Sequence, residues 1–176
     1  MEAVGYDMYL QMLSEAIEAG GGEVLPEKKE CIIDIAIDAH IPEKYIPSVK
    51  NRISMYKRIA SVDSEYEAMD VIDEFIDRFG EPPESVKGLV DVALIRNRAA
   101  KAGVYEVKQR QDAIAVFVSD IKPKHITALS AVFRRRAFIG SDKGKQYVVI
   151  KLMNEDVLKV LDKAVRVFEM PLEVQE

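Results

Sequence analysis

The hydrophobic pattern of this chain changes at Gly103, and that change constrains the fold more than any other feature. Before Gly103, apolar residues recur every three or four positions, which predicts amphipathic helices. After Gly103, short apolar runs at residues 104–107, 113–118, 138–139 and 147–152 predict strands. We therefore expect an α+β fold, with a helical first half and an antiparallel sheet in the second half.

Two segments of the second half share one order of elements. Residues 104–135 and 137–168 each have the pattern of two strands followed by a helix, and Asn154 is suited to cap the second of these helices. We expect the two strand–strand–helix units to form an internal structural repeat. Together they would make a four-stranded antiparallel sheet with two helices on one face.

The first half is expected to contain one strand and four helices. Strict alternation predicts the strand over residues 30–38, and helical periodicity predicts helices over residues 4–19, 48–60, 64–79 and 84–102. Ser48 and Ser64 have side chains that cap helix N-termini, and Gly103 is suited to follow a helix C-terminus. We expect residues 1–176 to form a single domain, in which 1–103 is the mainly helical half and 104–176 the sheet half.

Composition narrows the class of protein. The chain has 176 residues, of which 48% are hydrophobic and 31% charged, as in soluble globular proteins. Cys31 is the only cysteine, so an intrachain disulfide is excluded and a reducing, cytoplasmic location is expected. No apolar run approaches the ~20 residues of a membrane-spanning helix, and the N-terminus lacks the pattern of a signal peptide, so no membrane contact is expected.

Residues suited to catalysis or to cofactor binding are scarce. The two histidines, His40 and His125, lie far apart in sequence and outside any H-E-x-x-H spacing, so we interpret them as solvated or capping residues. Neither a Walker-type phosphate loop nor a G-x-G-x-x-G motif occurs. Cys31 lies in an apolar strand-like run, which favours a buried, inert thiol. We therefore expect no catalytic residues, no cofactor and no metal site; a small hydrolase with an unrecognised site is a rival hypothesis.

Charge is divided unevenly along the chain. Residues 1–80 hold 17 acidic and 8 basic side chains, whereas residues 81–176 hold 13 acidic and 17 basic ones, which gives balances of −9 and +4 and a net charge of −5. The net charge disfavours a wholly basic nucleic-acid-binding domain. The division suggests that the two halves serve different surfaces.

Four carboxylates form an acidic stripe on the helix predicted over residues 64–79. Glu67, Asp70, Glu74 and Asp77 are three, four and three residues apart, so they share one face of the helix. Arg78 is the one basic residue of this helix, and the helix dipole disfavours a carboxylate at Asp77 in the last turn. We expect the stripe to meet a basic partner, within the chain or on another surface. The opposite, apolar face is predicted to bury Ala68, Ile72, Phe75, Ile76 and Phe79.

A cluster of three arginines, Arg134, Arg135 and Arg136, ends the helix that begins near Lys124. Cations at a helix C-terminus interact favourably with the dipole, which favours a structural role. Together with nearby lysines the cluster would also form a phosphate-binding patch, and a nucleic-acid-binding accessory domain is the alternative function. Aromatic residues are not interleaved with these cations in the sequence, so recognition of single strands is not favoured.

An ordered series of short motifs resembles a known family. The motifs are Val4-Gly5-Tyr6-Asp7-Met8-Tyr9-Leu10, Ile41-Pro42, Tyr45-Ile46-Pro47, Arg52, Tyr56-Lys57-Arg58-Ile59-Ala60-Ser61, Ile76-Asp77-Arg78-Phe79-Gly80 and Pro83. In order and spacing they resemble the C-terminal domain of the bacterial transcription-repair coupling factor, Mfd. The resemblance is strong over residues 4–103 and rests mainly on the pattern of elements over 104–176. It implies that the chain is an excised domain of a longer protein.

The resemblance implies a regulatory role without catalysis. In the family, the full protein is an ATP-driven DNA translocase that displaces stalled RNA polymerase and recruits the repair subunit UvrA. Its C-terminal regulatory domain lies outside the motor and masks the UvrA-binding module by intramolecular docking until the protein engages stalled polymerase. UvrA and RNA polymerase are then indirect partners, and a DNA contact by this domain is not favoured. Family acidic residues corresponding to Glu74 and Asp77 pair with arginines of the masked module, and we extend this role to Asp70 and Glu67.

Overall fold

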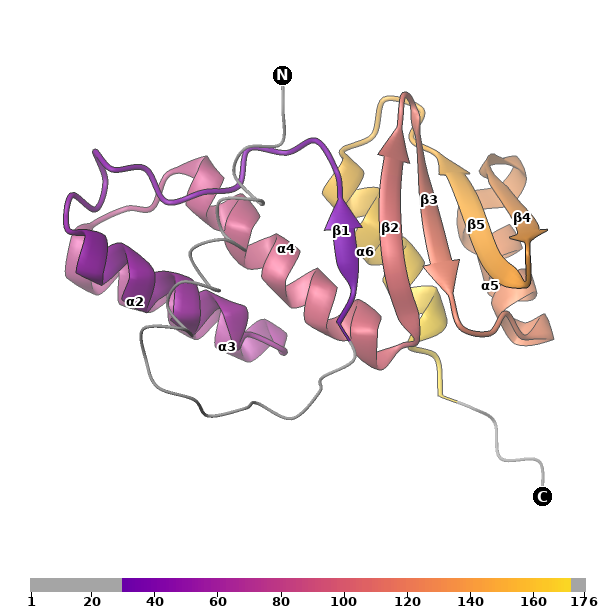
Figure 1. Cartoon of the computed structure of the whole chain (residues 1–176), viewed down its shortest axis with the longest axis horizontal. Helices are drawn as coiled ribbons and strands as arrows, with labels where there is room; N and C mark the ends of the chain where they lie inside the picture. Colours follow the sequence, from indigo (N-terminus) through magenta and orange to yellow (C-terminus); the bar gives the residue numbers. More distant parts are fainter. Residues whose placement is uncertain (1–29, 172–176) are drawn as a thin grey trace. The chain divides into compact units, whose positions relative to one another are not determined.

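A computed structural model of the chain describes residues 30–171, so the helix predicted over residues 4–19 lies outside the described residues (Figure 1). The described residues divide into two compact units. Residues 36–94 belong to the first unit, and residues 30–35 and 95–171 belong to the second.

Three helices account for most of the first unit. They are α2 (Val49–Ala60), α3 (Glu65–Phe79) and α4 (Glu84–Lys101), and the last two turns of α4 extend into the second unit. Ser48 Oγ accepts a hydrogen bond from the Asn51 N–H at 3.3 Å, and Ser64 Oγ accepts one from the Glu67 N–H at 3.2 Å. The capping serines and the positions of these three helices are therefore as predicted.

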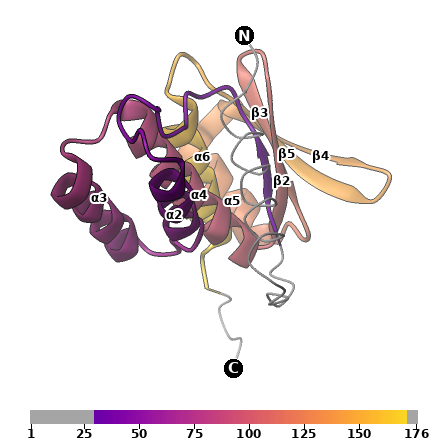
Figure 2. The ribbon, with the colours of Figure 1, turned by 60° about the vertical axis from the view of Figure 1, so that its left-hand side comes forward.

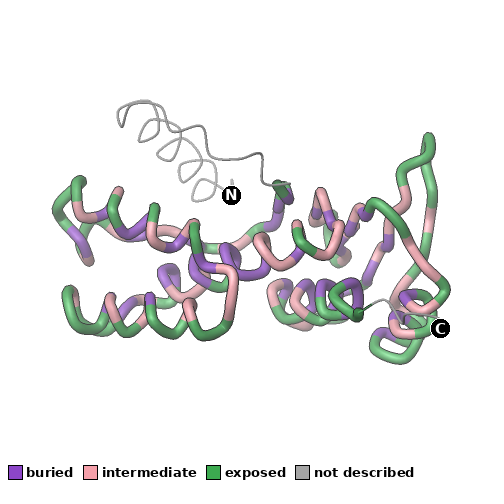
Figure 3. Tube along the Cα trace, turned by 90° about the horizontal axis from the view of Figure 1, so that it is seen from below, coloured by how far each residue is buried: buried purple, intermediate pink, exposed green. Residues whose placement is uncertain are grey.

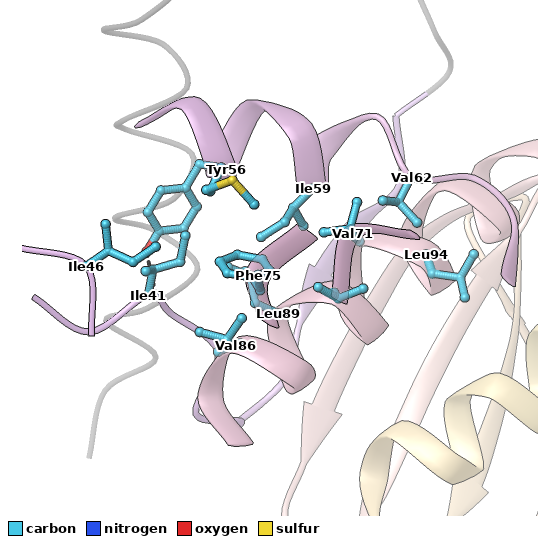
Figure 4. Packing of buried hydrophobic residues seen from close by; sticks show 14 residues of the cluster. Ile41, Ile46, Tyr56, Ile59, Val62, Val71, Phe75, Val86, Leu89 and Leu94 are labelled. Atoms are coloured by element: carbon cyan, nitrogen blue, oxygen red, sulfur yellow. Dashed lines mark hydrogen bonds between the residues drawn. The ribbon is translucent and has the colours of Figure 1, made fainter. Parts of the chain in front are cut away.

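A buried apolar cluster holds the first unit together (Figure 4). Phe75 of α3 and Met55 and Ile59 of α2 are fully buried in it. Tyr56 reaches across the cluster, and its Oη accepts a hydrogen bond from the Ile41 N–H at 2.9 Å. The guanidinium of the buried Arg52 donates hydrogen bonds to two backbone carbonyls of the preceding loop, at 2.8 and 3.1 Å. These contacts satisfy the polar groups that the cluster encloses.

The second unit contains a five-stranded sheet. Its strands are β1 (Ile32–Asp34), β2 (Val104–Arg110), β3 (Ala113–Val118), β4 (Ala137–Asp142) and β5 (Lys145–Lys151), in the order β1-β2-β3-β5-β4. Strands β2 to β5 are antiparallel, as expected, and β1 adds a parallel strand beside β2. The α+β fold class is confirmed. The sheet is wider than expected because the strand predicted over residues 30–38 pairs with β2, although over Ile32–Asp34 alone.

Helices α5 (Pro123–Phe133) and α6 (Val157–Phe168) cover one face of this sheet (Figure 2). Strand residues that alternate toward these helices are fully buried: Ile114, Val116, Val148 and Ile150. The prediction that Asn154 caps the last helix is wrong. Asp156 is the N-cap, since its carboxylate accepts a hydrogen bond from the Lys159 N–H at 3.1 Å, while Asn154 lies in a left-handed turn with φ 65°.

Candidate functional site

The acidic stripe begins at a residue that caps its own helix. Glu67 lies in the first turn of α3, and its N–H donates to Ser64 Oγ at 3.2 Å. The Glu67 carboxylate in turn accepts a hydrogen bond from the Asp63 N–H at 2.9 Å. Glu67 is therefore engaged in a reciprocal capping arrangement that stabilises the start of α3.

Two arginines neutralise the middle of the acidic stripe. Glu74 forms ion pairs with Arg78 one turn later, at 2.6 Å, and with Arg58 of α2, at 3.6 Å. Arg58 also contacts the carboxylate of Asp70, at 3.4 Å. The basic partner that we expected for the stripe is thus supplied from within the chain for Asp70 and Glu74. These side chains are about a third or more exposed, so each pair contributes modestly to stability.

Asp77 has no such partner. It is exposed, and no basic group within residues 30–171 forms an ion pair with it. Asp73, one turn earlier on α3, is likewise exposed without an ion pair to any described residue. Two carboxylates of α3 therefore remain available to a cation from outside the described part of the chain.

The buried side of α3 is rotated from the predicted one. Val71 and Phe75 are fully buried, whereas Ile76 is 42% exposed, so the prediction that Ile76 packs in the core is wrong. Ile76 lies five residues, or about 140° of helix rotation, from Val71, and it therefore falls on the solvent side. Val71, which the predicted apolar face omits, is fully buried instead.

Exposed apolar side chains accompany the two free carboxylates. Tyr66 is 76% exposed, Met69 67% and Ile76 42%. Tyr66, Met69, Asp73 and Ile76 recur at steps of three, four and three, and Asp77 follows directly, so all five residues share the exposed side of the helix. We call these five residues the α3 outer face. Their spacing can be found in the sequence, but the acidic stripe beside it is the more regular pattern and alone was predicted as a surface. Buried and exposed sides of the helices are distinguished by colour in Figure 3.

The three arginines do not act as one patch. They form a short 3₁₀ turn, η1 (Arg134–Arg136), after α5. Arg136 donates to Glu155 at 2.5 Å, and Glu155 also accepts from Lys163 at 2.8 Å. These hydrogen bonds, first from Lys163 and then from Arg136, lower the pKa of Glu155. Arg134 and Arg135 are exposed and form no ion pair with described residues. Arg136 is thus a structural residue, and two cations of the cluster remain free.

The remaining candidates for chemistry each have a local structural role. His40 Nδ1 lies 2.7 Å from a carboxylate oxygen of Asp38. His125 is buried at the start of α5, where its Nδ1 accepts a hydrogen bond from the Lys122 N–H at 3.2 Å. Burial, followed by the charges of Lys124 and Lys122, lowers the pKa of His125. Burial raises the pKa of Cys31 to about 12, so its thiol is protonated and unreactive at neutral pH.

The described part of the chain, residues 30–171, contains no group of three or more His, Cys, Asp or Glu residues placed to hold a metal ion. None of its helices is both long enough and apolar enough to span a membrane.

Sequence comparisons identify the relatives of this chain. The family model described as the TRCF domain matches residues 35–129, which is more than half of the chain. The transcription-repair-coupling factor of Bacillus subtilis (strain 168) is 35% identical over 168 residues, which cover 92% of this chain and 14% of that protein. The factor of Staphylococcus epidermidis (strain RP62A) is 36% identical over 121 residues, covering 68% and 10% of the two proteins. The chain thus spans a small part of the length of these relatives.

A solved structure agrees with the sequence comparisons. The crystal structure of the C-terminal domain of transcription-repair coupling factor superposes with a TM-score of 0.69 at 25% identity. The match covers 80% of this chain and 91% of that one. The chain therefore belongs to the TRCF domain family, the C-terminal domain of transcription-repair coupling factor.

Proposed function

We propose that this chain is a regulatory domain that docks on the UvrA-binding module of a transcription-repair coupling factor and masks it until the factor engages stalled RNA polymerase. The α3 outer face is the observation that carries the proposal. It places three exposed apolar side chains around two carboxylates that have no ion pair with the described residues. Such a surface suits a partner that presents arginines among apolar side chains.

The residues of the acidic stripe differ in how well they suit docking. Asp77 is the principal contact, because its charge is exposed and uncompensated by the described residues. Glu74 is a secondary contact, since a partner arginine would have to share it with Arg58 and Arg78. Asp70 and Glu67 take lesser roles because Arg58 and the N-terminus of α3 already engage them.

A docking contact of this composition can be reversible. Charge pairs at the rim of an interface act mainly on association rate and specificity, and salt weakens them. Masking requires that the docked and released states differ by a few kcal/mol, since a larger gap would prevent release. Three apolar side chains and two carboxylates are compatible with a gap of that size.

Competition tests the proposal. The chain would be added in trans to the isolated UvrA-binding module of a coupling factor, and binding of labelled UvrA to that module would be measured by fluorescence anisotropy. We expect the chain to displace UvrA and the Asp77→Lys variant to do so at least tenfold less well. Asp112→Lys, which makes the same charge change at the exposed β2–β3 turn, is the matched control and should compete like the unmodified chain. Simultaneous binding of UvrA and the chain would refute masking.

A further inference from the structure

The sheet of the second unit has a second face, opposite α5 and α6. No described helix of that unit covers this face. The pairing of β3 with β5 shows which residues lie side by side on this face: Phe117 is opposite Tyr147, and Ala113 is opposite Lys151. Partners in these pairs alternate with the fully buried residues of the same strands, so they project from the other side of the sheet.

Aromatic rings from neighbouring strands meet on this face. The ring of Tyr105, on β2, lies 6.3 Å from that of Phe117, which lies 5.5 Å from the ring of Tyr147. We call these three residues the aromatic strip. Phe138 of the edge strand β4 extends the apolar surface and is 51% exposed. Tyr105 and Phe117 are 12 positions apart and Phe117 and Tyr147 are 30 apart, so no short motif reveals the aromatic strip in the sequence.

A glycine positions one ring of the aromatic strip. Gly140 on β4 pairs with Tyr147 on β5, and a Cβ atom at residue 140 would lie 2.6 Å from Tyr147 Cε2. The ring of Tyr147 therefore lies against the backbone of β4, in space that any other residue would occupy. This packing restrains the ring before a ligand arrives, which reduces the entropy lost on binding.

Cations border the aromatic strip. Lys108 lies over the Phe117 ring at 5.8 Å, and Lys151 lies over the Phe138 ring at 5.6 Å. Arg110 and Lys145 project from the same face and are exposed. Glu106, which lies opposite Phe117 in the β2–β3 register, is engaged by Lys108 at 2.8 Å. Two further carboxylates occupy the margins of the face: Asp34 on β1 and Asp142 at the β4–β5 turn.

We propose that this face binds single-stranded nucleic acid, with unpaired bases stacked on the aromatic strip and phosphates held by the surrounding lysines and arginines. Neighbouring aromatic rings and flanking cations on an open sheet are the elements that single-strand recognition uses. The bases of a duplex are stacked on one another and cannot stack on the aromatic strip, so a duplex would bind through the cations alone. An acidic peptide could bind the cations, but its carboxylates would make no favourable contact with three adjacent aromatic rings. The proposal is independent of docking through α3, because it rests on other residues.

The assay is fluorescence anisotropy of the 176-residue chain with labelled 12-nucleotide oligouridylate and oligothymidylate, alongside a labelled duplex of equal length. We expect both single strands to bind at least fivefold more tightly than the duplex in low salt. Phe117→Leu and Tyr147→Leu keep apolar side chains in place while removing the rings, and each is expected to weaken binding at least fivefold. Gly140→Ala should also weaken binding, because it displaces the Tyr147 ring.

Matched controls separate stacking from other causes. Tyr66→Leu removes an exposed aromatic ring of α3 and should leave oligonucleotide binding unchanged. Thermal melts of each variant verify folding. Equal binding of duplex and single strands, loss of binding in Arg134→Ala/Arg135→Ala with no effect of the two leucine variants, or no binding at 100 µM chain would each overturn the proposal. A change in elution volume on gel filtration in the leucine variants, without any oligonucleotide binding, would identify the face as a protein interface instead.

Discussion

Removing the charge of Glu74 and removing that of Asp77 should change thermal stability in opposite directions. The substitutions Glu74→Gln and Asp77→Asn each delete one negative charge and nearly preserve side-chain size. Glu74 contacts Arg78 at 2.6 Å and Arg58 at 3.6 Å, whereas Asp77 makes no ion pair with a described residue. Both residues lie on α3, three positions apart.

The magnitudes follow from exposure and position. Glu74 is 34% exposed and its arginines 35% and 41%, so solvent screening limits the two pairs to about 0.5–1 kcal/mol together. For a chain of this size, that loss lowers Tm by about 1–4 °C. Asp77 lies in the last turn, where the helix dipole opposes a negative charge by about 0.3–1 kcal/mol, and Asp73 repels it from one turn away. Asp77→Asn should therefore raise Tm by about 1–3 °C.

Differential scanning fluorimetry or calorimetry of the two variants and the unmodified chain measures the difference. Raising the salt concentration to 1 M should bring all three melting temperatures closer together, since the charges are then screened. A fall in Tm for Asp77→Asn as large as that for Glu74→Gln would refute the reasoning, because it would show that Asp77 is stabilised by a cation within the chain.

Three further results are expected. The chain should show no ATPase activity, since its sequence has no phosphate loop; hydrolysis that a point substitution within the chain abolishes would contradict this. Duplex DNA should bind weakly at physiological salt, because Glu155 already engages Arg136. A specific Kd below about 10⁻⁷ M that is lost in Arg134→Ala/Arg135→Ala/Arg136→Ala would contradict this. The free energy of unfolding, measured with urea, should lose nothing to His125 above pH ~6.5, the usual His pKa. It should fall as the pH is lowered from there through the depressed pKa of His125, because the unfolded chain then binds a proton more readily than the folded one. His125→Asn should flatten this dependence, and an unchanged pH profile would contradict it.

Local signals were sufficient to predict most of the elements. Ser48 and Ser64 mark helix starts because their side chains satisfy free backbone N–H groups, and Gly103 follows α4 with φ 83°. These effects act within a few residues, so the sequence reveals them. The parallel pairing of β1 with β2 joins residues 32–34 to 106–108, and no local pattern specifies such a distant pairing.

The candidate site was predictable in part. The acidic stripe and its Asp77 follow from helical spacing alone, and Asp77 retains the uncompensated charge within the described residues. That Arg58 of α2 would neutralise Asp70 and Glu74 depends on how α2 packs against α3, which the sequence does not show. Ile76 was misplaced because a five-residue offset from Val71 lies near the edge of the apolar face, where periodicity discriminates poorly.

A charge-reversal cycle tests docking through the α3 outer face most directly. The affinity of the chain for an isolated UvrA-binding module would be measured by isothermal titration calorimetry, for the unmodified pair, for Asp77→Lys, for an arginine-to-glutamate variant of the module, and for both variants together. We expect each single reversal to weaken binding at least tenfold and the double reversal to restore much of it, with a coupling that decreases as salt is raised. Unchanged affinity in folded Asp77→Lys, or additive losses for every arginine of the module that is tested, would contradict docking through Asp77.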